Sequence, residues 1–122
     1  MIERIDDVPA GVTGLRADGE LSAEDYKETL EPALGAAAET GEIRLLYVLG
    51  PDFEMRPGAM AQDAKVGFGI GIGHHEAWKR TAVVTDAEWV ARSIRAFAWM
   101  MPGDVHVFAS AEEEAARTWV AG

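Results

Sequence analysis

The apolar positions of the chain are most continuous at Ile43–Leu49, where a single arginine interrupts the run. Gly50 and Pro51 follow it directly and signal a turn. A short run of this kind, bounded by turn residues, is typical of a strand covered on both faces. In open α/β sheets, sites form in the crevice outside the carboxyl ends of the strands. Residues 52–58 are therefore the first place where we expect a functional site.

Apolar segments on either side of this run predict further strands. Residues 1–5 and 12–17 precede it, and an Asp-Gly pair after the second segment is a strong turn signal. Because these two strands are short and adjacent, they predict an antiparallel start to the sheet. Residues 80–85 and 105–108 follow the central run and predict two more strands.

Helical spacing of apolar residues begins after Ser22, and Asp25 completes the pattern of a capping box with it. The apolar stripe continues to Gly41, which is expected to end the helix. Pro32 lies inside this stripe and predicts a kink or a local break, because proline removes a backbone donor and clashes with the preceding turn.

Two more helices are expected towards the end of the chain. Asp86 is expected to cap the first of them, and Ser110 with Glu113 has the spacing of a capping box for the second. The buried stripe of the first helix is predicted to be Val90, Ile94, Phe97 and Met101.

Residues 58–73 allow two interpretations. Residues 58–65 have a helical pattern, but glycines then alternate with Phe68, Ile70 and Ile72. In a strand these three apolar residues would share one face, whereas in a helix each glycine would cost about 1 kcal/mol relative to alanine. Periodicity alone leaves both open. The predicted order is β-β-α-β-α-β-α-β-α, and 122 residues predict one domain with parallel strands from Ile43 onward.

Composition narrows the class of protein. The chain has no cysteine, which excludes disulfides and thiol chemistry. The net charge of −10 and the scattered basic residues argue against nucleic-acid binding, and such acidity is more typical of solubility than of a cationic partner. The first residues lack the features of a signal peptide, and no apolar run approaches the roughly 20 residues of a membrane span. We therefore expect a soluble cytoplasmic protein.

The candidate chemistry is sparse. The four glycines at 67–73 are spaced by two, unlike the G-x-G-x-x-G of a dinucleotide loop. His74 and His75 are adjacent and lack the spacing of a zincin helix, so no metal site and no cofactor are expected. Residues 41–80 contain no serine or threonine, which removes hydroxyl nucleophiles from the expected site. These observations argue against an enzyme.

Three side chains stand out as candidate binding groups. Asp52 and Phe53 lie on the turn after the central strand, and Phe53 is expected to be either a lid over the core or one wall of a pocket. Trp99 lies off the apolar stripe of its helix. It is expected either to be exposed for a partner or to pack against Trp119 of the last helix.

Several segments resemble the SpoIIAA-like family of small bacterial proteins, and the resemblance covers nearly the whole chain. The matching segments are Leu21-Ser22-Ala23-Glu24-Asp25-Tyr26, Asp52-Phe53, Asp63-Ala64-Lys65, Ala82-Val83-Val84-Thr85-Asp86 with Trp89, and Ala116-Arg117-Thr118-Trp119. This family is related to the STAS domains of anti-sigma-factor antagonists and is compared with CRAL-TRIO lipid-binding domains. The resemblance implies an α/β, STAS-like fold, with a mixed central sheet, helices mainly on one face, and a helix from 58 to about 72.

The related antagonists switch by phosphorylation of a serine at the start of the second helix. This sequence has Pro-Gly-Ala at residues 57–59 and no hydroxyl nearby, so a phosphorylation switch of that type is not expected.

Two functional hypotheses follow. The first is a non-catalytic module that binds a small apolar or amphipathic, lipid-like ligand at the carboxyl ends of the strands, with Asp52, Phe53, His74 and Trp78 as candidate ligand-binding residues. The second is a protein-interaction module of the STAS kind without the phosphorylatable serine. Trp99 and Met100 are then the candidate interaction surface, either for another protein or for a second copy in a homodimer.

Overall fold

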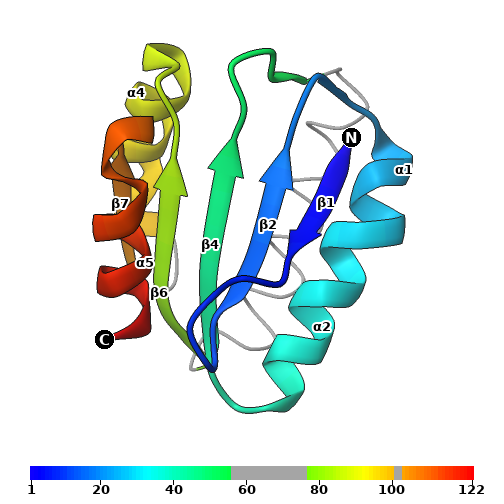
Figure 1. Ribbon diagram of the computed structural model, residues 1–122, viewed down its shortest axis with the longest axis vertical. Coiled ribbons are helices and arrows are strands. Elements are labelled where there is room, and N and C mark those ends of the chain that lie inside the picture. Colours follow the sequence, from blue (N-terminus) through cyan, green and yellow to red (C-terminus); the bar gives the residue numbers. More distant parts are fainter. Residues whose placement is uncertain (56–76, 101–102) are drawn as a thin grey trace.

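The computed structural model describes residues 1–55, 77–100 and 103–122. At its centre lies a five-stranded sheet with the order β1-β2-β4-β6-β7 (Figure 1). β1 runs antiparallel to β2, and every other neighbouring pair is parallel, which confirms the mixed sheet expected from the sequence. The strands are β1 (Ile2–Ile5), β2 (Thr13–Ala17), β4 (Ile43–Leu49), β6 (Trp78–Val84) and β7 (Asp104–Phe108).

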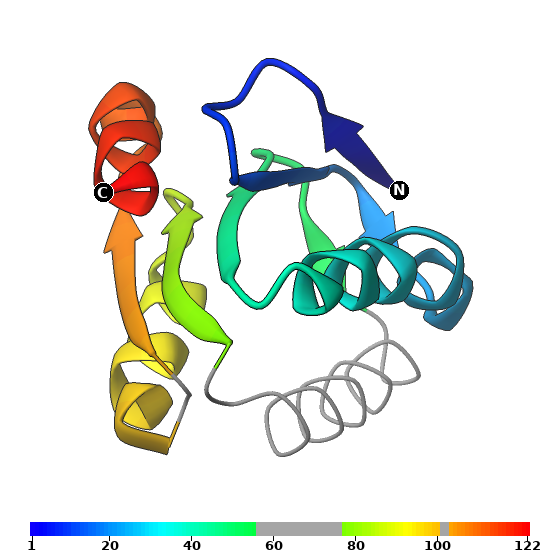
Figure 2. The ribbon, with the colours of Figure 1, turned by 90° about the horizontal axis from the view of Figure 1, so that it is seen from below.

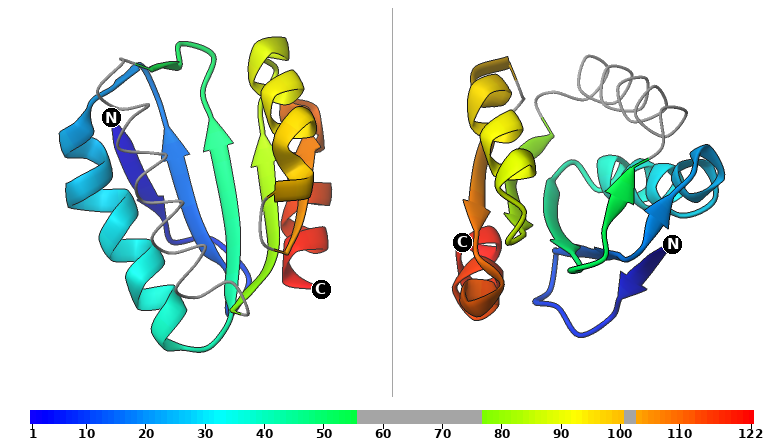
Figure 3. Two further views of the ribbon diagram at one scale, coloured as in Figure 1. Left: turned by 180° about the vertical axis from the view of Figure 1, so that it is seen from behind. Right: turned by 90° about the horizontal axis from the view of Figure 1, so that it is seen from above.

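Helices cover both faces of this sheet. The helical segments on one face are α1 (Ala23–Asp25), a π-helical turn (Tyr26–Leu30), α2 (Glu31–Glu39) and α4 (Glu88–Phe97) with a 3-10 turn (Ala98–Met100). α5 (Glu113–Ala121), which follows a 3-10 turn (Ser110–Glu112), lies on the other face. Figure 2 shows α2 and α4 on the side opposite α5, and Figure 3 shows the same arrangement from behind and from above.

The central strand β4 contributes to two cores. Ile43 and Leu45 pack with the α2 residues, whereas Leu46 and Val48 pack with α5. Because successive side chains of a strand point to opposite faces, a nearly continuous apolar run is what such two-sided burial requires. The prediction of a strand covered on both faces is therefore confirmed.

The first helical segment begins as predicted. The backbone N–H and hydroxyl of Ser22 donate to Asp25 at 3.0 and 3.2 Å, and the Asp25 N–H donates back to the Ser22 Oγ at 3.4 Å. Pro32 is at the start of α2, directly after the π-helical turn. Since proline disturbs the preceding turn, this wider turn is the local break expected from the sequence.

The last helix begins differently from its predicted start. The Glu112 carboxylate, rather than that of Glu113, accepts from the Ala109 N–H at 2.9 Å. Ser110 instead donates through its N–H to Asp86 at 2.9 Å and also through its hydroxyl. Asp86 therefore does not cap α4, and the Ala87 N–H donates to the Thr85 Oγ1. The predicted roles of Asp86, Ser110 and Glu113 were wrong.

The sequence pattern also missed a second, two-stranded sheet. β3 (Glu20–Leu21) pairs in parallel with β5 (Glu54–Met55) beside the carboxyl end of β4. Strands of two residues are too short to show alternation. The helix predicted at 58–65 and the glycine run at 67–73 lie outside the described residues.

Candidate functional site

The loop after β4 is held against β2 at the carboxyl edge of the sheet. The Gly50 N–H donates to the Ala17 carbonyl at 2.8 Å, and the Glu54 N–H donates to the Gly19 carbonyl at 2.7 Å. A Cβ at Gly50 would lie 1.7 Å from the Asp18 Oδ1, so the absence of a side chain permits this close approach. These contacts fix the direction in which the next residues leave the sheet.

Phe53 and Trp89 form an aromatic pair at this edge. Their ring centroids are 6.0 Å apart and the rings are inclined by 16°. Phe53 is half-buried and packs against the α2-side core, as a lid does, whereas Trp89 at the start of α4 is 53% exposed. Asp52 is exposed on the turn beside Phe53. The carboxyl edge thus presents one anchored ring, one open ring and a solvated carboxylate.

Trp78 does not belong to this edge. It begins β6 and pairs with Ile43 at the amino end of β4, whereas Asp52 and Phe53 follow Leu49 at the other end. The length of β4 separates these ends by about 20 Å at the rise of a β-strand. The prediction that Phe53 and Trp78 face one hollow at the carboxyl ends was wrong. His74, the fourth predicted residue of that site, lies outside the described residues.

Trp78 nevertheless has an unusual environment. Its ring packs against the α2-side core, and its indole Nε1 is buried and donates to no described residue. A buried donor without an acceptor costs about 1–3 kcal/mol. Such a group is a natural point of attachment for an acceptor atom of a ligand or a water.

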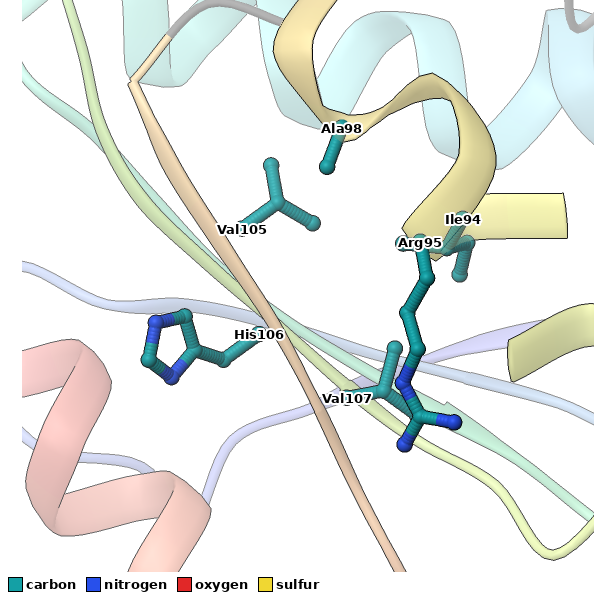
Figure 4. Close-up of a pocket in the computed structure, with 6 residues that line it drawn as sticks. All are labelled: Ile94, Arg95, Ala98, Val105, His106 and Val107. Atoms are coloured by element: carbon teal, nitrogen blue, oxygen red, sulfur yellow. The ribbon is translucent and has the colours of Figure 1, made fainter. Parts of the chain in front are cut away.

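A shallow hollow lies between α4 and β7, beside the 3-10 turn that carries Trp99 (Figure 4). Its volume is about 240 Å³. Figure 4 shows the Arg95 side chain extending towards Val107, and His106 pointing to the other side of β7. The lining residues are Ile94, Arg95, Ala98, Val105, His106 and Val107.

Trp99 itself is 82% exposed, which makes it the most exposed large apolar side chain of the described residues. It does not pack against Trp119, so that alternative was wrong. Trp119 instead contacts two other side chains of the same chain. The His106 ring stacks on it with the ring centroids 4.5 Å apart, and the Arg80 guanidinium lies 5.1 Å from its ring centroid. Met100 lies in the same 3-10 turn as Trp99.

Within residues 1–55, 77–100 and 103–122, no three carboxylate or imidazole side chains converge as metal ligands do. The Asp86 carboxyl has a lowered pKa because the hydroxyl and then the N–H of Ser110 donate to its charged form. Both residues are exposed, and this contact joins the loops after β6 and β7. In the same part of the chain, every helix is too short or too polar to cross a membrane.

Sequence reasoning missed Trp89 as a site residue. The signal was present, because Trp89 immediately precedes Val90 and lies off the stripe formed by Val90 and Ile94. Val90 is buried and Trp89 is exposed, as that spacing requires. Its contact with Phe53 joins segments 36 positions apart in the sequence (53 to 89), which periodicity cannot reveal.

Comparison with known proteins places this fold in a family. The chain is similar to a crystal structure of a DUF3478-family protein with a SpoIIAA-like fold from Shewanella loihica PV-4. The two share 27% sequence identity and a TM-score of 0.69, over 98% of this chain and 90% of the other. No curated protein matches the sequence. The family model described as SpoIIAA-like matches residues 12–121, and the chain therefore belongs to the SpoIIAA-like family.

Proposed function

We propose that this protein is a non-catalytic protein-interaction module, and that Trp99 and the hollow between α4 and β7 form its binding surface. The observation that supports this most strongly is the 82% exposure of the Trp99 side chain. Single exposed apolar residues are common, but a tryptophan is a large apolar surface and is enriched at the centres of protein interfaces.

The hollow adds a second reason for this choice. Ile94 from α4 and Ala98 from the following 3-10 turn face Val105 and Val107 from β7, and Arg95 and His106 complete the lining, so a hollow of mixed polarity lies next to the turn that carries Trp99. Its volume of about 240 Å³ exceeds the cavity of about 150 Å³ that accepts benzene in an engineered protein. The hollow therefore has room for a side chain of a partner whose neighbouring residues contact Trp99.

Site-specific photo-crosslinking tests this proposal. A photoreactive phenylalanine analogue replaces Trp99 in the host cell, and the same analogue replaces Ala36, which is exposed on α2, as the matched control. We expect a discrete adduct from position 99 and none from position 36. Excess wild-type protein should suppress the adduct, whereas excess Trp99→Ala protein should not. Identical adducts from both positions would contradict the proposed surface.

Binding of a small amphipathic ligand is the second candidate function, supported by the buried Nε1 of Trp78, which donates to none of the described residues. The carboxylate or phosphate oxygen of a lipid-like molecule would accept this hydrogen bond, while the α2-side core would contact its apolar part. This candidate places the ligand at the amino end of β6 rather than at the carboxyl edge of the sheet.

Native mass spectrometry of protein purified from the host, followed by lipid extraction, tests the second candidate. Oleate added to the delipidated protein serves as the probe. Trp78→Phe keeps the aromatic ring and removes the N–H, so we expect about tenfold weaker oleate binding with an unchanged fold. Equal affinity of the two proteins, or no affinity in either, would refute a role for this donor.

A further inference from the structure

Each ring of the aromatic pair at the carboxyl edge has acidic neighbours in the sequence. Phe53 lies between Asp52 and Glu54 in the sequence, and Trp89 directly follows Glu88. All three acidic residues are exposed. Because Phe53 and Trp89 stack at 6.0 Å, these acids from two distant segments come to the same edge of the sheet, and we call the two rings with Asp52, Glu54 and Glu88 the aromatic-acidic edge.

Little of this negative charge is neutralised locally. Glu88 pairs with Arg92 at 3.6 Å, but both side chains are more than three-quarters exposed, and such pairs are weak. Within the described residues, Asp52 and Glu54 form no ion pair. The surface therefore combines an open indole face with carboxylates that are free to accept hydrogen bonds.

The α5 face of the protein shows which kind of group packs on an indole ring in this fold. The Arg80 guanidinium lies over the Trp119 ring at 5.1 Å and also donates to the Trp119 carbonyl at 2.6 Å. In the described part of the chain, no cation lies over the ring of Trp89 in this way. A guanidinium group suits an open indole with acidic neighbours, because it is planar, stacks on aromatic rings and donates hydrogen bonds to carboxylates.

We infer that the aromatic-acidic edge binds an arginine-bearing segment of another protein, with a guanidinium on the free face of Trp89 and hydrogen bonds to the neighbouring carboxylates. Phe53 fixes the orientation of the indole from the opposite side. The net charge of −10 assists the approach of a basic segment. This surface is distinct from that of Trp99, so the inference does not depend on the proposed function.

The four tryptophans make the test direct, because each indole N–H gives its own signal in a nitrogen-correlated NMR spectrum. The ¹⁵N-labelled full chain is titrated with a capped Gly-Arg-Gly-Arg-Gly peptide. We expect a saturable shift of the Trp89 signal, with the Trp78 and Trp119 signals unmoved. The matching lysine peptide should bind at least threefold more weakly, because ammonium does not stack on the ring.

Charge-matched variants separate specific binding from general attraction. Asp52→Asn should weaken binding of the arginine peptide at least threefold, and Trp89→Leu should abolish the saturable response. Asp6→Asn removes the same charge from an exposed position in a different loop and should change the affinity by less than a factor of 1.5. Equal weakening by Asp52→Asn and Asp6→Asn, or an unmoved Trp89 signal, would overturn the inference. Crosslinking from position 99 would be unaffected by that result.

Discussion

The tryptophan side chains on the two faces of the sheet differ in their packing and in their exposure to solvent. On the α5 face, Trp119 is held by His106 and by Arg80, and it packs against a core of buried residues. On the α4 side, Trp78 packs against the α2-side core, but Trp89 and Trp99 are 53% and 82% exposed. The α5 face thus packs its tryptophan against the fold, whereas the α4 side leaves two of its tryptophans open to solvent. Substitutions on the two sides should therefore affect different properties.

The largest loss of stability is expected inside the α5-side core. Leu46 is completely buried between β4 and α5, so Leu46→Ala leaves a cavity as well as losing apolar burial. We expect a loss of about 2–5 kcal/mol in the free energy of unfolding, measured by urea denaturation. A loss below about 1 kcal/mol would mean that the α5 face is not the well-packed side.

A smaller loss is expected at the turn before β7. Gly103 has φ +73°, and a Cβ there would lie 2.8 Å from the Trp78 carbonyl oxygen. Gly103→Ala should cost about 2–3 kcal/mol, because positive φ and a backbone clash add. Gly41→Ala is the matched control, since Gly41 has φ +89° with nothing within 4 Å of the added carbon, and it should cost about 1 kcal/mol. Equal losses in the free energy of unfolding for the two variants, measured by urea denaturation, would show that the backbone clash at Gly103 contributes nothing.

Variants of one arginine on each face allow a direct comparison of how much the two faces contribute to stability. Arg80→Met removes a charged hydrogen bond to Trp119 and the contact with its ring, and it should cost about 1–2 kcal/mol. Arg92→Met removes an exposed ion pair with Glu88 and should cost less than about 0.5 kcal/mol. Thermal unfolding of the two variants measures both effects. A larger loss of stability from Arg92→Met than from Arg80→Met would contradict the view that the α5 face is the stabilising side.

The smallest effect concerns Asp86, whose pKa is lowered by the two hydrogen bonds from Ser110. A lowered pKa in the folded state means that the contact stabilises the protein above the ordinary value of 3.8 and that this contribution is lost as the pH falls through the folded pKa. The melting temperature of Ser110→Ala should lie below that of the wild type at pH 6, and the gap should narrow below pH 4. A gap that stays constant with pH would exclude this linkage.

Sequence reasoning succeeded where one local pattern determines the structure. Ile43–Leu49 has the predicted bounds because both faces of β4 are buried, and Ser22 with Asp25 forms a cap because three-residue spacing suffices for it. It failed at the start of β6. The register shifts between Ile43 and Arg44, so Lys79 is an extra residue between Trp78 and Arg80. This bulge interrupts the alternation that would have included Trp78 in the strand.

The candidate site was less predictable than the fold, because it depends on contacts between distant segments. Asp86 and Ser110 are 24 residues apart, and the order of the sheet brings their loops together. The exposure of Trp99 could be anticipated from its place off the helical stripe, but the position of Trp78 at the opposite end of the sheet from Phe53 could not.

The Trp99→Ala variant tests the central claim most directly, because its stability and its partner binding can be measured on the same protein. The free energy of unfolding should stay within about 0.5 kcal/mol of the wild type, since an exposed side chain adds little to the fold. The affinity for the partner crosslinked through position 99 should fall at least tenfold. A loss of stability above about 2 kcal/mol, or an unchanged affinity, would contradict the separation of a stabilising face from a binding face.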